Sequence, residues 1–391
     1  MCPPCSLHGP RVHKVPSLGC TESLPMSLGC TGSLPMAPGC TGSLPCSCGV
    51  HDVPSPLPAA LGCPGPFPPP APCPPSPSVH NISGFAALPG HVQDFLRYRH
   101  CRAFRPLLDA PGKCGGPGRS AGVFLLLAIK SSPENYERRE VIRKTWGQER
   151  SVAGARVRRL FLCGVAPGAA GAKLDRLLRL EQREHGDVLQ WDFRDTFFNL
   201  TLKQVLFHAW LQQSCPGARF VFNGDDDVFV NTDNVVRFAL GAGAAADGHL
   251  FVGHLIANVG PIRSRGSKYY VPPQVTAAER YPPYCGGGGV LMSGFTARAI
   301  ARQAPAVELF PIDDVYLGMC LEKAGLAPAS HAGIRTLGIR VPPPAEPFDP
   351  CYYRELLLVH RSVPYETALM WQAIRQPRLR CGRRVGVYPR A

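Results

Sequence analysis

The chain has 391 residues, of which 45% are hydrophobic and 18% are charged, and its formal net charge is +14 at pH 7. This length is sufficient for one large catalytic domain or two smaller ones. Residues 1–80 hold two basic and two acidic residues, so the whole positive excess lies in residues 81–391. Because no run of five or more Lys or Arg residues occurs, a phosphorylated small molecule matches this charge better than nucleic acid, which we do not expect as a partner.

The first 80 residues differ in composition from the rest of the chain. Residues 18–47 contain a ten-residue near-repeat, LGCTESLPMS, LGCTGSLPMA and PGCTGSLPCS, and a proline-rich tract follows it. Neither part has a helical or strand period, so we predict that residues 1–80 are disordered or polyproline-like and that residues 81–391 form the catalytic domain. The N-terminus shows neither a signal peptide nor the roughly 20 apolar residues of a membrane span.

The cysteines fall into two groups, nine before residue 80 and eight after it. The later eight are widely separated and lack the paired close spacing of a structural zinc site, which favours disulfides for most of them. Two N-glycosylation sequons begin at Asn81 and Asn199. Together these features favour an oxidising, lumenal compartment.

From about residue 90 the pattern changes to strands alternating with helices. GVFLLLAI (122–129) is a continuous apolar run of the buried-strand type, and Ser131-Ser132-Pro133-Glu134 predicts a capping box that starts a helix running toward Trp146. A strand (157–162), a helix (172–185), a strand (187–191), a helix (201–212) and a strand (219–223) follow. The helix over 201–212 is predicted to place Leu202, Val205, Leu206, Ala209 and Trp210 on one face. This series predicts an α/β fold with a mainly parallel sheet and ligands at the carboxyl ends of its strands.

Three adjacent carboxylates, Asp225-Asp226-Asp227, follow the last of these strands. They would repel one another unless a cation neutralised them, and Mg²⁺ or Mn²⁺ shared with a diphosphate fits that requirement. An acidic turn that caps the following helix is the alternative, and the residues alone leave it open. His360, at the end of an apolar run, is a structural residue unless the fold places it beside such a metal.

A second acidic pair, Asp313-Asp314, opens a predicted helix, where one carboxylate could take a proton from a substrate or simply cap the helix. Between the two acidic elements lies Cys285 with four glycines after it, which permit close approach of a ligand or form a flexible connector. Four nearby tyrosines offer rings that could stack on sugars or pack in the core: Tyr269, Tyr270, Tyr281 and Tyr284.

Seven segments occur in order along roughly residues 90–385: ERREVIRKTWG (137–147), FFNLTLKQ (197–204), GDDDVFVN (224–231), KYYVPP (268–273), YPPYCGGGGVLMS (281–293), FPIDDVYLGMCL (310–321) and DPCYYRELLLVHR (349–361). Jointly they resemble the beta-1,3-glycosyltransferase family, which includes galactosyl- and N-acetylglucosaminyltransferases. FPIDDVYLGMCL followed by HAGIRTLGI looks like the N-acetylglucosaminyl branch. The resemblance implies a Rossmann-like nucleotide-binding fold of the GT-A type with a DxD motif.

The resemblance also implies roles for individual residues. Asp225 and Asp227 match the DxD metal motif, and His360 matches a histidine near the metal. Asp314 matches the catalytic base, with Asp313 beside it. The implied donor-binding residues are Arg138, Arg139, Arg143, Trp146, Lys203, Asp226, Gly287, Gly288 and Gly289.

The implied reaction is a single displacement with Mn²⁺ (or Mg²⁺) as cofactor. N-acetylglucosamine (GlcNAc) passes from UDP-GlcNAc to the 3-hydroxyl of a terminal galactose or N-acetylgalactosamine (GalNAc), and the linkage inverts from alpha to beta. A beta-1,3-galactosyltransferase that uses UDP-galactose is one alternative. A catalytically silent sugar-binding protein is another, although the intact Asp225, Asp227 and Asp314 argue against it.

Family members are usually type II Golgi membrane proteins, so the resemblance implies a location in the Golgi lumen or membrane. Residues 1–80 carry the repeat and the proline-rich tract where a membrane anchor is expected. Membrane association is therefore expected from the family, without a transmembrane segment in this sequence, and a homodimer is left open.

Overall fold

The structure is a computed structural model that describes residues 73–169, 171–242, 248–336 and 348–382. The chain divides into two units, Met1–Gly65 and Pro66–Ala391, and every described residue belongs to the second. The ten-residue repeat and most of the proline-rich tract lie outside the described residues. The predicted division of the chain near residue 80 therefore stays a prediction.

A nine-stranded mixed sheet forms the centre of the second unit. Its order is β1 (Pro106–Leu108), β5 (Val188–Arg194), β4 (Ala155–Val165), β2 (Leu125–Lys130), β6 (Phe220–Asp225), β11 (Gly289–Ser293), β8 (Phe251–Gly253) and β12 (Ala329–Ser330), with β3 (Ser151–Val152) beside β4. The strands β5, β4, β2 and β6 are parallel, whereas β11 is antiparallel to both of its neighbours. The prediction of an α/β fold with parallel strands is confirmed.

Two smaller sheets lie outside the main one. β9 (Leu255–Ile256) pairs with β10 (Tyr284–Cys285), and β14 (Leu358–His360) lies between β13 (Ile334–Arg335) and β7 (Val228–Val230). Because β7 directly follows the three aspartates, its antiparallel pairing with β14 brings the C-terminal region of the chain to the end of β6.

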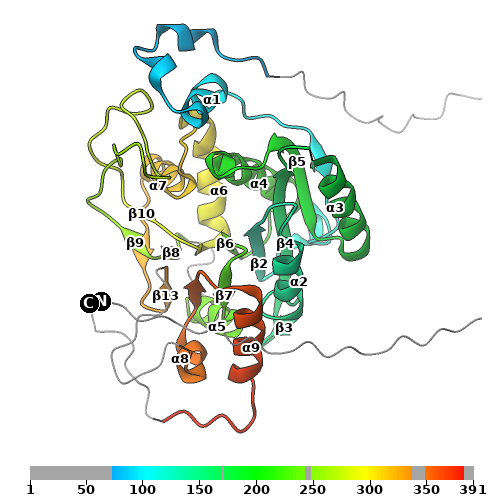
Figure 1. Ribbon diagram of the computed structural model, residues 1–391. Coiled ribbons are helices and arrows are strands. Elements are labelled where there is room, and N and C mark those ends of the chain that lie inside the picture. The colour runs from blue at the N-terminus through cyan, green and yellow to red at the C-terminus, as the bar shows by residue number, and fades with distance from the viewer. Residues whose placement is uncertain (1–72, 170, 243–247, 337–347, 383–391) are drawn as a thin grey trace, which may run out of the picture. The chain divides into compact units, whose positions relative to one another are not determined.

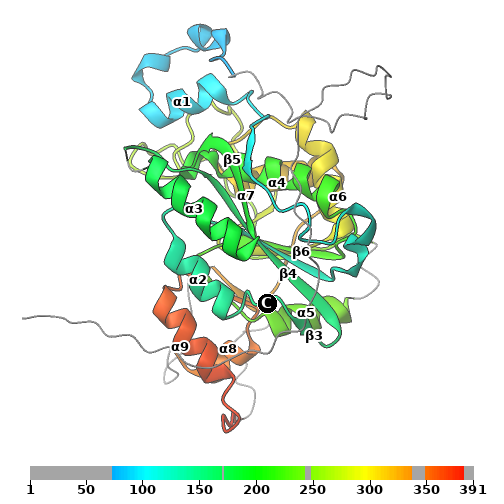
Figure 2. The same cartoon turned by 90° about the vertical axis from the view of Figure 1, so that its right-hand side faces the viewer.

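Helices cover both faces of the main sheet (Figure 1). One hydrophobic cluster contains side chains of α1 (Gly90–Tyr98), α4 (Leu200–Ser214), α6 (Gly294–Gln303) and α7 (Asp313–Lys323). The other contains side chains of α2 (Tyr136–Lys144), α3 (Gly171–His185), α5 (Thr232–Gly241), α8 (Pro350–Glu355) and α9 (Pro364–Ile374). Figure 2 shows the sheet between α2 and α3 on one side and α4 and α6 on the other. Short 3₁₀ helices occur at η1 (Pro77–Asn81), η2 (Phe85–Ala87), η3 (Pro117–Gly122), η4 (Phe197–Asn199) and η6 (Ala304–Ala306).

The strand β2 explains this layering. All six of its residues are buried, and successive side chains alternate between the two clusters: Leu126 and Ala128 join one, whereas Leu125, Leu127 and Ile129 join the other. A strand buried on both faces needs apolar side chains on both, which gives the continuous apolar run seen in the sequence. Only the last residue of β2, Lys130, is charged, and it lies at the carboxyl edge of the sheet.

Two sequence-based details differ from the structure. Helix α2 begins at Tyr136, and its N-cap residue Asn135 makes no side-chain capping bond, so the predicted capping box is wrong. The hydroxyls of Ser131 and Ser132 instead donate to Asp226 and Asp195, since those tertiary partners lie at the same edge of the sheet.

Helix α4 is more deeply buried than a one-sided helix would be. Lys203, Gln204, Phe207 and His208 are buried as well as the predicted apolar face, whereas Ala209, which we assigned to that face, is exposed. The helix packs between the sheet and helices α6 and α7, so almost its whole circumference contacts protein. A face predicted from 3.6-residue spacing fails for a helix that is covered on several sides.

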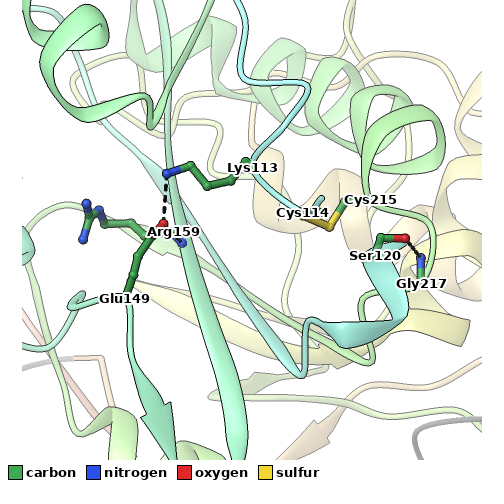
Figure 3. The surroundings of a disulfide bond; sticks show 7 residues. All are labelled: Lys113, Cys114, Ser120, Glu149, Arg159, Cys215 and Gly217. Atoms are coloured by element: carbon green, nitrogen blue, oxygen red, sulfur yellow. Dashed lines mark hydrogen bonds and ion pairs between the residues drawn. A yellow bond between two sulfur atoms is a disulfide. The ribbon is translucent and has the colours of Figure 1, made fainter. Parts of the chain in front are cut away.

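Three disulfides are present in the described residues: Cys73–Cys101, Cys114–Cys215 and Cys351–Cys381. The expectation that most of the later cysteines form disulfides is confirmed, because five of those eight are paired and three are free and buried: Cys163, Cys285 and Cys320. Figure 3 shows Cys114–Cys215, which ties the segment after β1 to the end of α4, near the Lys113–Glu149 ion pair. Cys73 pairs across the boundary between the two cysteine groups, which the sequence did not predict.

Candidate active site

The three aspartates form the turn between β6 and β7. Asp225 is the last residue of β6, and Asp227 directly precedes β7. In the register of β7 and β14, His360 lies opposite Val228, so it reaches this turn from the far end of the chain. Ligand atoms of Asp225, Asp227 and His360 all lie within 4.8 Å of one another. The structure therefore brings together the three residues that the resemblance implies for a metal.

The hydrogen bonds of His360 fix which ring nitrogen faces the turn. Nδ1 lies 3.0 Å from the carbonyl oxygen of Thr336, and because a carbonyl only accepts, Nδ1 carries the proton. Nε2 lies 3.3 Å from Oδ1 of Asp227. Burial disfavours the charged ring, but the hydrogen bond and charge of Asp227 prevail and raise the pKa of His360. Two carboxylates and one imidazole nitrogen form a donor set that fits Mn²⁺ or Mg²⁺.

Asp226, the middle residue of the motif, faces the turn after β2. Its Oδ2 accepts hydrogen bonds from the Ser131 hydroxyl at 2.7 Å and from Asn135 Nδ2 at 2.9 Å. Arg138 Nη1 lies 3.4 Å from Asp226 and 3.9 Å from Asp227, with the Arg138 side chain 32% exposed. Arg138 is thus a partly exposed cation beside the acidic turn, whereas Asp226 joins that turn to β2 and α2.

Lys130 connects the two acidic elements, and the sequence analysis did not single it out. Its Nζ lies 3.0 Å from Asp225 and 2.6 Å from Asp313, and the side chain is only 7% exposed. In the parallel pairing of β2 with β6, Lys130 is directly opposite Asp225. A charged residue that ends each of two neighbouring apolar strands was the available sequence signal.

The carboxylates of Asp313 and Asp314 have different surroundings. Asp313 is 6% exposed, and its Oδ2 accepts from Lys130 and from Gln204, at 2.6 and 3.0 Å. Asp314 is half-buried, and its Oδ2 accepts a hydrogen bond from the backbone N–H of Gly287 at 3.1 Å. Burial and the adjacent charge of Asp313 raise the pKa of Asp314 to about 7, whereas Lys130 holds the pKa of Asp313 low against burial. Asp314 is therefore the carboxylate that can accept a proton near neutral pH.

Glycines between β10 and β11 allow the backbone there to lie close to His360 and Thr336. Gly287 and Gly288 have φ values of 71° and 83°, which favour glycine. A Cβ on Gly288 would lie 2.9 Å from the His360 ring, and one on Gly287 would lie 2.8 Å from Thr336. One on Gly289 would lie 2.8 Å from Phe222. These glycines make room for the protein's own side chains, and their contact with the donor sugar stays a prediction.

Three of the expected donor-binding residues lie inside the protein. Arg139 donates to both carboxylate oxygens of Glu181, and Arg143 pairs with Glu181 and Asp187. Arg139 is 1% and Trp146 0% exposed. Arg139 and Arg143 thus join α2 to α3 and the sheet through ion pairs, and direct contact of these arginines and of Trp146 with the donor stays a prediction.

Lys203 is also buried, at 1% exposure, and supports the carboxyl edge of the sheet. Its Nζ lies 2.9 Å from Asp195, which follows β5, and donates to the carbonyl of Ser131, which follows β2. Asp195 in turn accepts from the Ser132 hydroxyl and from the backbone N–H of Gly164. Lys203 therefore fixes the turn from which Ser131 donates to Asp226 of the acidic motif.

Of the four tyrosines considered for sugar stacking, Tyr269 is the most exposed, at 40%, whereas Tyr270 and Tyr281 are buried at 7% and 9%. Tyr269 packs edge-on against Phe197, and the Lys268 ammonium lies over both rings. Tyr284 is half-buried beside Tyr281. Tyr269 is the ring among them that remains available to a ligand.

Comparison with solved structures gives low similarity. The galactosyltransferase LgtC, solved with donor and acceptor sugar analogues, has a TM-score of 0.32 and 12% identity and covers 63% of this chain and 95% of its own. The glycosyltransferase GlyE from Streptococcus pneumoniae has a TM-score of 0.32 and 14% identity and covers 64% of this chain and 62% of its own.

Comparison of sequences gives close relatives. Human N-acetyllactosaminide beta-1,3-N-acetylglucosaminyltransferase 3 is 56% identical, covering 88% of this chain and 91% of the relative. Human acetylgalactosaminyl-O-glycosyl-glycoprotein beta-1,3-N-acetylglucosaminyltransferase is 56% identical, covering 84% and 86%. The model of the Galactosyltransferase family matches residues 137–332, which include the acidic turn and the Asp313-Asp314 pair. The chain therefore belongs to the Galactosyltransferase family, a family of glycosyltransferases, as its seven motifs predicted.

Proposed function

We propose that this protein transfers GlcNAc from UDP-GlcNAc to the 3-hydroxyl of a terminal galactose or GalNAc on a glycan, with inversion to a beta linkage. The names of its relatives support the donor sugar and the linkage, since both 56% identical human proteins are beta-1,3-N-acetylglucosaminyltransferases. One of these names specifies lactosaminide and the other a GalNAc-initiated O-glycan, which supports galactose or GalNAc as the acceptor.

The observation that carries the proposal is the convergence of both acidic elements on Lys130. Because Lys130 Nζ contacts Asp225 and Asp313, the acidic turn and the start of α7 lie at one site. An inverting transfer needs one carboxylate that accepts a proton and a second charged element that binds the diphosphate. Asp314 is suited to the first need, and the cluster of Asp225, Asp227 and His360 is suited to the second.

In the proposed mechanism Asp314 removes the proton of the acceptor 3-hydroxyl. The hydroxyl oxygen attacks the anomeric carbon from the face opposite UDP, the bond to UDP breaks, and one displacement inverts the configuration. Asp225, Asp227 and His360 would hold a divalent cation, Mn²⁺ or Mg²⁺, and when bound it would neutralise charge on the diphosphate. Arg138 of α2, which lies beside the acidic turn, would add a second positive charge near the diphosphate. Asp226 accepts a hydrogen bond from the Ser131 hydroxyl, and Lys203 donates to the Ser131 carbonyl. These two contacts connect the acidic turn to the end of β2.

The donor and acceptor are tested together with purified full-length protein and Mn²⁺. UDP-GlcNAc and UDP-galactose compete for transfer to a galactose-terminated and a GalNAc-terminated acceptor, and mass spectrometry distinguishes the two products. We expect an added GlcNAc. An added galactose would leave the mechanism intact but favour the alternative galactosyltransferase. UDP binding without transfer of either sugar would favour the silent sugar-binding protein.

We also propose that the enzyme works in the lumen of the secretory pathway, in the Golgi lumen or at its membrane. Three disulfides among the described residues support an oxidising compartment. Across residues 73–382 with their gaps, no helix has the length and apolar character needed to cross a membrane. Immunolocalisation of the full chain beside a Golgi marker tests this location, and retention in the cytosol would contradict it.

A further inference from the structure

A buried amide connects three elements behind the acidic residues of the site. Gln204 is the last residue of the FFNLTLKQ segment and lies in α4, where it is 1% exposed. Its Nε2 donates to Oδ2 of Asp313 at 3.0 Å and to Oδ1 of Asn223 at 2.9 Å. Because Asp313 begins α7 and Asn223 belongs to β6, this one side chain joins α4 to the two elements that carry the carboxylates.

The partners of Gln204 fix the orientation of its amide. An ionised carboxylate only accepts hydrogen bonds, so the Nε2 side of the amide must face Asp313. The two N–H groups of Nε2 meet two acceptors, whereas Oε1 has no partner in the described part of the chain. Turning the amide over would place Oε1 against the Asp313 carboxylate and remove both bonds. The side chain therefore has one favourable orientation.

The same face of β6 carries Asn223 and Asp225. Side chains two residues apart point to the same face of a strand, and Val221, two residues before Asn223, packs in the hydrophobic cluster that contains α4. Lys130, opposite Asp225 on β2, also bonds to Asp313. The polar contacts that join the acidic turn to α7 therefore lie on the α4 side of the sheet.

Asp313 in turn sets the place of the carboxylate beside it. Asp313 and Asp314 are the first two residues of α7, so a fixed Asp313 fixes the turn that carries Asp314. Lys130 and Gln204 both donate to the same oxygen, Oδ2 of Asp313. Without the bond from Gln204, Lys130 alone would hold this oxygen, and the carboxylate could turn about that single contact.

We propose that Gln204 is a positioning residue for the transfer reaction and holds Asp313 so that Asp314 meets the acceptor hydroxyl. This inference rests on the proposed function, in which Asp314 is the base. At 1% exposure Gln204 does not touch the reacting atoms, and its effect passes through Asp313. Its loss should therefore lower turnover and leave donor binding unchanged.

Gln204→Glu makes the bond to Asp313 depend on pH, because only the protonated acid can donate it. The charged groups beside this position are Asp313 of α7 and Lys130 of β2, which already faces a second carboxylate, Asp225. His208, one turn further along α4, is neutral because burial lowers its pKa to about 4. Burial and the excess of carboxylates should raise the pKa of the new glutamate above its usual value of about 4.3. The bond is then present at low pH and gives way to repulsion as the pH rises.

Turnover is measured at about pH 6 and at about pH 8.5 with Mn²⁺, UDP-GlcNAc and a galactose-terminated acceptor. We expect the kcat of Gln204→Glu, divided by that of the native enzyme at the same pH, to be at least about tenfold lower at the higher pH, with an unchanged KM for UDP-GlcNAc. Gln204→Leu cannot donate at any pH and should lose kcat about equally at both. Gln213→Glu, the same change on an exposed residue of α4, should match the native enzyme. A kcat ratio for Gln204→Glu that does not change with pH would overturn the proposal.

Unfolding by denaturant tests the contact with Asp313 and does not depend on transfer. A glutamate whose pKa is raised by folding keeps its full contribution to stability below the unfolded pKa of about 4.3 and loses it as the pH rises through the folded pKa. The stability of Gln204→Glu relative to the native protein should therefore fall between about pH 5 and about pH 8.5, whereas that of Gln213→Glu should not. If it does not fall, Gln204 does not face Asp313 and the proposal is wrong.

The two measurements together separate positioning from support of the fold. If the stability of Gln204→Glu falls with pH while its kcat ratio stays constant, Gln204 has only a structural role, and the proposal is overturned. A native enzyme that transfers no sugar would instead count against the proposed function, because the unfolding measurement does not depend on it.

Discussion

Lys130 Nζ lies 2.6 Å from Oδ2 of Asp313, and the same ammonium group lies 3.0 Å from Asp225. A single buried cation thus neutralises one carboxylate of each acidic element. The elements are 88 residues apart in sequence, at the end of β6 and the start of α7, and β2 carries the lysine between them. The geometry of the site depends on this contact because Asp313 is almost fully buried and Lys130 supplies the charge that neutralises it.

Replacing Lys130 should therefore damage both activity and stability. Lys130→Met leaves Asp225 and Asp313 without their shared cation, and breaking a buried pair in this way costs about 3–5 kcal/mol. We expect turnover to fall at least about 100-fold and the thermal midpoint to drop, measured by transfer assay and calorimetry. Lys144→Met, on the 75% exposed Lys144 of α2, is the control that should change neither. Normal turnover in Lys130→Met would refute this role.

The two carboxylates of α7 should respond differently to the same change. Asp314→Asn removes the proton acceptor, so we expect turnover to fall about 10²–10⁴-fold while UDP binding is kept. Asp313→Asn removes the partner of Lys130 and should mainly lower stability. Steady-state kinetics and UDP calorimetry on both variants check this. The assignment fails if Asp314→Asn keeps near-normal turnover while Asp313→Asn abolishes it.

The pH profile follows from the raised pKa of Asp314. Burial and the charge of Asp313 place this pKa at about 7, and the protonated acid cannot accept a proton. The rate at saturating Mn²⁺ should therefore fall as the pH drops through about 7, approaching tenfold per unit below it, and level off above it. An ordinary carboxylate, with a pKa of about 4, would give a flat profile from pH 5 to pH 8, and that result would contradict the assignment.

Replacing the proposed metal ligands should remove the effect of Mn²⁺ on UDP binding. Chelation of divalent ions should abolish transfer, and added Mn²⁺ should restore it. Asp227→Ala and His360→Ala each remove one member of the cluster, so we expect UDP to bind these variants at least about tenfold more weakly with Mn²⁺ and about equally without it. Calorimetric titration measures this difference, and Glu184→Ala, on the 73% exposed Glu184 of α3, serves as the control. Unchanged Mn²⁺-dependent binding in both variants would reject the cluster.

Two arginines of the same helix should separate donor binding from stability. Arg138 is 32% exposed beside the acidic turn, so Arg138→Ala should raise the KM for the donor with little loss of stability. Arg143 is 6% exposed, and Arg143→Ala removes one of the two arginines that pair with each of Glu181 and Asp187, which should cost about 1–3 kcal/mol of unfolding free energy. Denaturant unfolding and donor titration of both variants check this. A stable Arg143→Ala enzyme with a raised donor KM would instead support the direct contact with the donor that the sequence predicted.

Features that leave a local signal in the sequence could be predicted, whereas contacts made by tertiary packing could not. The apolar run of β2 and the acidic residues after β6 were predictable, because a strand buried on both faces and a carboxylate at its end each leave a local signal. The contact of His360 with Asp227 needed the family resemblance, since only the pairing of β7 with β14 brings them together. The ion pairs of Arg139 with Glu181 and of Lys130 with Asp225 are tertiary contacts, so residue spacing could not predict them.

The configuration of the product tests the central claim most directly. Purified full-length protein with Mn²⁺, UDP-GlcNAc and a galactose-terminated acceptor is allowed to react, and proton NMR of the isolated product identifies the new linkage. The account predicts GlcNAc joined in a beta linkage to the 3-position, formed by the native enzyme and not by Asp314→Asn. An alpha linkage, or a beta linkage formed equally well by Asp314→Asn, would contradict a single displacement with Asp314 as the base.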